Sequence, residues 1–235
     1  MCVTDVAYSL AMNVQILPSL LAADFGNLEA AARKAEASGG DALHIDIMDG
    51  HFVPNLSMGP EVVKMAHRCI NIPLSVHLMM THPDQYLNRF IDAGADSVLI
   101  HIESECDVPE ALERIRELGA HPGITLNPKT PPELIFPVFD KVDEVLCMTV
   151  HPGYGGQSFM PDVLPKIRVL RDRSNSMDKK ELNILVDGGI DCENAVKCAA
   201  HGANILIAGT TLFNSSDMAS EISLMRQKAS EALVI

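Results

Sequence analysis

Two histidines and two aspartates lie in short apolar runs that are typical of β-strands. These four residues come from three separate runs: His44 with Asp46, His77, and Asp187. Because alternate side chains of a strand point to the same face, His44 and Asp46 are predicted to project in one direction. Buried imidazoles and carboxylates are costly to desolvate without a partner, and a divalent metal ion is a common partner. We therefore predict a metal site built from these four side chains.

The ligand set also narrows the choice of metal. Two imidazoles and two carboxylates suit zinc, iron(II), manganese or cobalt better than calcium or magnesium. A single histidine in an apolar run is more often a structural core residue, but four such residues at strand ends favour a shared ion. The sequence does not choose among the four metals.

Asp46 and Asp187 are also predicted to transfer protons. They belong to the second and seventh predicted strands, which can face each other across a closed eight-stranded sheet. Removing a proton next to a carbonyl requires a base and a group that stabilises the enolate oxygen, which a metal ion can provide. Two carboxylates on opposite sides of a substrate, one ionised and one protonated, would invert the configuration at that carbon.

Three glycine-containing loops follow the last three predicted strands: 152–158, 187–189 and 209–211. Glycine allows the backbone to approach a ligand closely, and loops of this kind often bind phosphate through backbone N–H groups. Since none of these loops contains Lys or Arg, we expect dipoles and not ion pairs to hold the anion.

Some residues near these strand ends have two interpretations. Methionine is commonly an adaptable core residue. Met48, Met79 and Met148 would alternatively cap the pocket floor and keep water away from a reactive intermediate. His101 ends the fourth predicted strand and could reach the pocket, although a structural role is favoured.

Strand and helix patterns alternate along the whole chain. The predicted strands cover 14–19, 42–48, 74–79, 96–101, 121–126, 144–150, 182–187 and 204–208. The predicted helices cover 26–38, 60–69, 83–93, 108–118, 132–137, 162–173, 192–201 and 217–232. Parallel neighbours require crossover connections, which the helices supply. Four helix-to-strand joints share a glycine near a small residue, which indicates one βα unit used repeatedly.

These patterns predict a single-domain (β/α)₈ TIM barrel over residues 13–235, preceded by an N-terminal extension over residues 1–12. A doubly wound open sheet is the alternative, but the glycine-rich dinucleotide-binding fingerprint is missing after the first strand. In a barrel, chemistry gathers at the carboxyl ends of the strands, where the polar residues above are placed.

Composition excludes several classes of function. The net charge of −13 argues against nucleic-acid binding, which needs clustered Lys and Arg. No apolar stretch reaches the roughly 18 residues of a membrane-spanning helix. The first dozen residues do not resemble a signal peptide, and the six cysteines show no framework spacing. We expect a cytoplasmic protein with reduced thiols.

The chain resembles the ribulose-phosphate 3-epimerase family over roughly residues 15–230. The matching segments are 17–25, 44–50, 52–55, 77–79, 126–128, 148–159 and 186–190, and they include His44-Ile45-Asp46-Ile47-Met48-Asp49-Gly50 and His151-Pro152-Gly153-Tyr154-Gly155-Gly156. In combination these motifs are highly specific.

The resemblance implies a barrel enzyme that interconverts D-ribulose 5-phosphate and D-xylulose 5-phosphate through a metal-stabilised enediolate. It implies metal ligation by His44, Asp46, His77 and Asp187, and acid/base roles for Asp46 and Asp187. Ser19 and His77 would contact the sugar. The phosphate would be lined by Gly153, Tyr154, Gly155, Gly156, Gly188, Gly189, Gly209 and Thr210. A homo-oligomer formed through helical faces is expected.

Some positions depart from the family pattern, namely Lys129, His151 and the segment 210–213. They leave the metal and acid/base set intact, but a hexulose 6-phosphate such as D-allulose 6-phosphate remains an alternative substrate. A barrel lyase is a second alternative, either an aldolase using Lys129 or a decarboxylase. A non-catalytic binding module is a third, which the complete ligand and carboxylate set disfavours.

Overall fold

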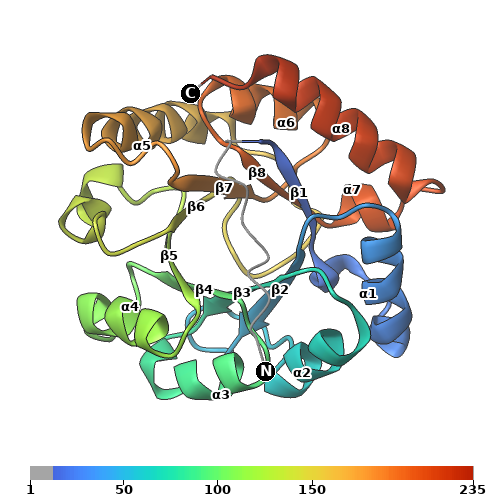
Figure 1. Cartoon of the computed structure of the whole chain (residues 1–235), viewed down its shortest axis with the longest axis horizontal. Coiled ribbons are helices and arrows are strands. Elements are labelled where there is room, and N and C mark those ends of the chain that lie inside the picture. Colours follow the sequence, from blue (N-terminus) through green and yellow to red (C-terminus); the bar gives the residue numbers. More distant parts are fainter. Residues whose placement is uncertain (1–12, 235) are drawn as a thin grey trace.

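A computed structural model describes residues 13–234, and within them eight parallel strands form one sheet. Figure 1 looks along the axis of this sheet and shows the strands as an inner ring surrounded by helices. The strands are β1 (Gln15–Pro18), β2 (Leu43–Met48), β3 (Leu74–Met79), β4 (Ser97–His101), β5 (His121–Leu126), β6 (Glu144–Met148), β7 (Asn183–Asp187) and β8 (Ile205–Ala208). Each pairs with its neighbours in the order β1-β8-β7-β6-β5-β4-β3-β2. The bridge from Ser19 to His44 brings β1 to β2, so the predicted (β/α)₈ barrel is confirmed.

The helices lie outside the strands. They are α1 (Leu28–Ala37), α2 (Pro60–Cys69), α3 (Leu87–Asp92), α4 (Val108–Glu117), α5 (Leu164–Ser176), α6 (Cys192–Ala200), α7 (Thr210–Phe213) and α8 (Met218–Ala232). The predicted helix over 132–137 is instead a 3-10 helix, Pro132–Val138, because Pro137 inside it has no N–H to donate. The short helix α7 was not predicted. No helix of the described residues is long and apolar enough to cross a membrane.

The repeated helix-to-strand joint is confirmed. Its four glycines all have positive φ, from +86° at Gly39 to +108° at Gly94, which is the left-handed conformation that ends a helix. The starts of α4 and α6 are also determined by the local sequence. Asp107 and Asp191 each accept a hydrogen bond from the backbone N–H of the residue three positions later. The proposed extension, residues 1–12, lies outside the described residues.

Alternation along the strands produces two apolar regions. One strand face packs against the helices in a large core that includes Ile45, Val76 and Val145. The other face fills the barrel interior with residues such as Leu99 and Leu146. The barrel is therefore a packed body, and polar groups inside it need a specific reason.

Glu144 is such a group at the amino-terminal end of β6. By alternation it shares the interior face with Leu146, and it is 3% exposed. Its Oε2 atom has no hydrogen-bond partner among the described residues. Burial raises the pKa of Glu144 from 4.5 to about 7.

Glu144→Gln should therefore change how stability depends on pH. Because the native carboxyl holds its proton more tightly than the unfolded one, the wild type loses stability as pH rises from 4.5 towards 7. The glutamine variant has no such loss. Its stability relative to wild type should rise by about 2–3 kcal/mol between about pH 5 and about pH 8, as measured by urea unfolding. A difference that does not vary with pH would contradict the raised pKa.

Candidate metal centre and active site

The four predicted metal ligands lie together on three strands, with Asp187 at the end of its strand and the other three within theirs. His44 and Asp46 come from β2, His77 from β3 and Asp187 from β7. One potential ligand atom of each lies within 4.8 Å of the others. His44 and His77 are fully buried, and Asp187 is partly exposed to the pocket above them. The barrel thus brings residues far apart in the sequence into one cluster.

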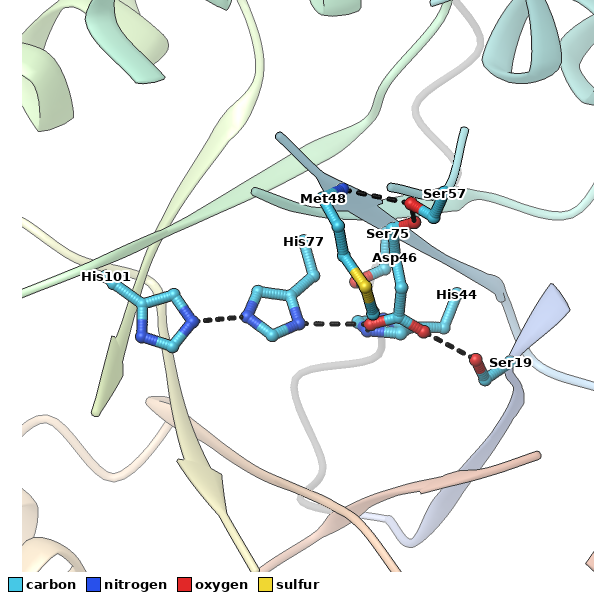
Figure 2. Close-up of polar contacts among 8 residues, drawn as sticks. All are labelled: Ser19, His44, Asp46, Met48, Ser57, Ser75, His77 and His101. Carbon is cyan, nitrogen blue, oxygen red and sulfur yellow. Dashed lines mark hydrogen bonds and ion pairs between the residues drawn. The ribbon is translucent and has the colours of Figure 1, made fainter. Parts of the chain in front are cut away.

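Asp46 is the centre of this cluster, as Figure 2 shows. Its Oδ2 atom accepts a 2.7 Å hydrogen bond from the Ser19 hydroxyl. Its Oδ1 atom lies 3.2 Å from His77 Nδ1 and 3.4 Å from His44 Nε2. Ser57 anchors the same strand by donating to the Asp46 carbonyl oxygen at 2.6 Å and accepting from the Met48 N–H. The carboxylate is therefore fixed in position from three sides.

His44 leaves one buried nitrogen without a hydrogen bond. Its Nδ1 atom is 3.1 Å from the Ser75 hydroxyl. Its Nε2 atom has no hydrogen-bond partner within the described chain, although it points towards Asp46 and is fully buried. A buried polar atom without a partner costs about 1–3 kcal/mol, and a metal ion on its lone pair would satisfy it. The unpaired nitrogen and the mixed donor set both fit a divalent cation.

The two carboxylates have opposite proton affinities. Burial opposes ionisation of Asp46, but its close contacts with the imidazoles of His44 and His77 hold its pKa well below the usual range. Burial, together with the negative charge of Asp46, raises the pKa of Asp187. Two neighbouring carboxyls that share one environment thus separate into an ionised and a more readily protonated member.

A cavity of about 570 Å³ opens directly above these residues. It is lined by these sequence-predicted residues: Ser19, Asp46, Met48, Met79, Met148, Gly153, Tyr154, Gly155, Gly156, Asp187, Gly188, Gly189, Gly209 and Thr210. His44 and His77 do not line it. They lie beneath the floor. The three methionines are at most 3% exposed and form an apolar surface beside the carboxylates.

The loop after β6 is tied across the mouth of the cavity to the loop after β2. The Tyr154 hydroxyl donates to the Pro54 carbonyl at 2.7 Å, and the Asn55 side chain donates to the Gly153 carbonyl at 2.7 Å. These contacts connect segments about a hundred residues apart. They hold the glycine-rich loop over one side of the cavity.

The glycines of these loops differ in what requires them. A Cβ atom at Gly188 would lie 2.4 Å from a methyl group of Val150, so packing alone excludes any side chain there. At Gly155 a Cβ atom would meet only the Thr210 hydroxyl, at 4.0 Å. Gly155 is thus free to carry a side chain within the fold, and a requirement for glycine there would come from a ligand.

Sequence reasoning missed two features of the site. Lys197 of α6 lines the cavity and forms a 2.7 Å ion pair with Glu193, so a cation lies near the loops that contain none. His101 is fully buried, and its Nε2 atom is 2.8 Å from His77 Nε2. The alternation of β4, which places His101 on the interior face with Leu99, is the signal that could have found the second feature.

Comparisons with known proteins show which proteins this chain resembles. The model of the ribulose-phosphate 3 epimerase family matches residues 15–213. A ribulose-phosphate 3-epimerase of Bacillus subtilis is 43% identical over 213 residues, covering 91% of this chain and 98% of that protein. The cytoplasmic isoform of rice, Oryza sativa, is 40% identical over 92% of this chain and 95% of its own length. A solved structure titled KGPDC, from Streptococcus mutans, superposes with a TM-score of 0.69 at 12% identity over 94% of this chain and 99% of that one, which is similarity of fold alone.

Divalent metal should stabilise the native protein through this cluster. Adding Co²⁺ at about 100 times its dissociation constant should stabilise the wild type by about 3 kcal/mol. His44→Phe keeps a planar ring but removes the unpaired nitrogen, so it should lose most of this gain. His121→Phe, a matched change at the opposite end of the barrel, should keep it. Thermal unfolding with and without metal measures both, and equal gains in the two variants would place the ion elsewhere.

Proposed function

The chain belongs to the ribulose-phosphate 3-epimerase family, and on this premise we propose that it interconverts D-ribulose 5-phosphate and D-xylulose 5-phosphate. The two ketoses differ only in configuration at C3. The reaction therefore consists of removing the C3 proton from one face and returning a proton to the other. We assign these two steps to Asp46 and Asp187.

The observation that carries this assignment is the pair of buried carboxyls with opposed pKa shifts. Asp46 is the member with the lowered pKa, its charge is stabilised by the Ser19 hydroxyl, and it can accept the proton. Asp187 holds a proton more readily and can deliver it to the opposite face. In the reverse direction the two roles exchange. A carboxyl pair of this kind suits inversion at one carbon.

The residues that would hold a divalent cation are His44, Asp46, His77 and Asp187. When bound there, the cation would supply positive charge that stabilises negative charge developing on the substrate oxygens. Zinc, iron(II), manganese and cobalt all suit this ligand set. One potential ligand atom of each of the four residues lies within 4.8 Å of the others, so binding an ion would need little reorganisation.

Other residues would position the sugar and exclude water. Ser19 lines the cavity and donates to Asp46, which places its hydroxyl between the carboxylate and the substrate. Met48, Met79 and Met148 cover the floor beside the reacting carbon. An apolar floor limits the loss of the transferred proton to solvent.

We propose that the phosphate group binds at the glycine-rich side of the cavity. Gly155, Gly156, Gly188, Gly189, Gly209 and Thr210 line this side. Backbone N–H groups of these loops could donate hydrogen bonds to the phosphate oxygens. Lys197 adds a positive charge at the same side of the cavity.

The lyase alternatives have less support. Lys129, the candidate Schiff-base nucleophile, is solvent-exposed and does not line the cavity. An aldolase lysine needs desolvation to lower its pKa. The hexulose alternative would use the same carboxylates. We further propose a cytoplasmic location, which the rice relative's name supports, and a homo-oligomer, which light scattering would test.

A coupled assay on metal-analysed protein tests the proposed function. D-ribulose 5-phosphate and D-allulose 6-phosphate are supplied in parallel, with and without chelator. We expect turnover of the pentulose that chelator abolishes and added metal restores. Preference for the hexulose would keep the mechanism and change the substrate, whereas inactivity on both would refute the proposal.

Asp187→Asn should abolish turnover while preserving the fold. The amide cannot donate or accept the transferred proton, so kcat should fall on the order of 10³-fold or more. The matched change Asp217→Asn should leave kcat unchanged, because Asp217 caps the surface helix α8 and asparagine caps as well. A kcat of Asp187→Asn within about tenfold of wild type would remove Asp187 from the mechanism.

Gly155→Val should weaken substrate binding without damaging the fold. The position has room for a side chain and does not have positive φ, so the branched group would block only the approach of the phosphate. KM should rise about tenfold or more with thermal stability nearly unchanged. Gly59→Val, which is also open and extended but lies outside the cavity, should leave KM unchanged. An unaltered KM in Gly155→Val would place the phosphate elsewhere.

A further inference from the structure

A chain of hydrogen bonds leads from Asp46 away from the cavity. Figure 2 shows Asp46, His77 and His101 in one line. His77 Nδ1 is 3.2 Å from Asp46 Oδ1, and His77 Nε2 is 2.8 Å from His101 Nε2. His101 Nδ1 is in turn 3.1 Å from Glu103 Oε2. Two buried imidazoles thus connect two carboxylates, one inside the proposed metal site and one outside it.

The contact between the two imidazoles requires a proton on the Nε2 atom of one ring and none on the Nε2 atom of the other. The ring planes of His77 and His101 differ by 24°, which suits an N–H···N hydrogen bond in the plane of both rings. One Nε2 must donate and the other accept. Two neutral imidazoles carry two ring protons between them. One proton lies between the two Nε2 atoms, and the other lies on one of the two Nδ1 atoms, so the remaining Nδ1 atom has a free lone pair. That nitrogen faces either Asp46 or Glu103.

Glu103 decides which nitrogen is free. Its Oε1 atom accepts from the Asn127 N–H at 2.9 Å and from the Thr130 hydroxyl. Although burial opposes ionisation, hydrogen bonds from His101, Thr130 and Asn127 lower the pKa of Glu103. An ionised carboxylate can only accept hydrogen bonds, so His101 places its proton on Nδ1. In this state His101 Nε2 accepts from His77 Nε2, and the lone pair of His77 Nδ1 is free for a metal ion, whose charge would offset that of the ionised Asp46 beside it.

We propose that His101 and Glu103 are positioning residues that fix the tautomer of His77, so that its Nδ1 lone pair is presented to a metal ion beside Asp46. This inference rests on the metal site of the proposed function. Metal-bound histidines commonly donate their other N–H to a carboxylate or carbonyl group. Here a second histidine extends that connection to a loop carboxylate outside the cavity.

Glu103→Gln should reverse the direction of donation along these hydrogen bonds. The Asn127 N–H can only donate, so the amide oxygen of the glutamine must remain on that side. Its NH₂ group then faces His101 Nδ1 and donates to it. The His101 proton moves to Nε2 and is donated to His77 Nε2, and the His77 proton moves to Nδ1, where it faces Asp46. Every hydrogen bond is satisfied in this state, but the ligand lone pair is lost.

The experiment measures Co²⁺ affinity and imidazole protonation in wild type, Glu103→Gln and Glu105→Gln. Glu105 is an exposed residue of the same loop and provides a matched control. We expect Glu103→Gln to bind Co²⁺ about 10–100-fold more weakly, while the control binds like wild type. Nitrogen NMR of the histidine rings should show the His101 proton on Nδ1 in zinc-loaded wild type and on Nε2 in metal-free Glu103→Gln.

Two further measurements separate positioning from a general loss of structure. The metal-free form of Glu103→Gln should be at least as stable as metal-free wild type, because its hydrogen bonds are all made. His101→Phe, which packs on Phe52 as His101 does at 4.6 Å between ring centroids, should weaken Co²⁺ binding less than Glu103→Gln. His101→Phe removes the acceptor of the His77 Nε2 N–H group but supplies no donor that would move the His77 proton to Nδ1.

The outcomes distinguish this inference from the proposed function. Unchanged Co²⁺ affinity in Glu103→Gln, or an unchanged His101 proton position, would overturn the positioning role. A wild type that binds no metal would instead refute the metal site of the proposed function.

Discussion

The structure depends on keeping one ionised carboxylate, that of Asp46, buried at the end of a barrel strand. Isolated charge in such a place is strongly unfavourable, so the hydroxyl of Ser19, which follows β1, donates to Asp46, and the imidazoles of His44 and His77 lie beside it. Ser19 takes part twice, since its backbone bridges β1 to β2 and its hydroxyl binds Asp46. Closure of the barrel and stabilisation of the charge are therefore achieved by the same residue. The raised pKa of Asp187 follows from the same negative charge.

Much of this arrangement could be predicted from the sequence because it follows strand alternation. His44 and Asp46 are two residues apart in a strand, and their common direction is independent of the rest of the fold. Parallel strands joined by helices bring strand ends together, which places Asp187 beside them although it lies far along the chain. The glycines at the four helix-to-strand joints likewise identify the repeated βα unit from the local sequence alone.

Other features depend on packing between distant segments and carry little local signal. Lys197 lies on a helix with an ordinary surface pattern, and nothing in that pattern indicates that the helix borders the cavity. His101 ends β4 in the manner of many core histidines, and its significance comes from its contact with the His77 ring on the neighbouring strand. The glycines are a third case, since the sequence cannot distinguish Gly188, which packing requires, from Gly155, which packing leaves free.

The depth of the two imidazoles has a consequence for exchange kinetics. His44 and His77 have no exposed surface, and beneath them the barrel is filled with aliphatic side chains. An ion held by these residues would have to enter and leave through the same mouth as the sugar phosphate. Bound sugar phosphate would then block this path and slow dissociation of the ion during turnover. Enzyme with bound substrate would keep its metal ion in the presence of a chelator that removes the ion from substrate-free enzyme. The time for which the ion stays bound would therefore depend on the concentration of substrate.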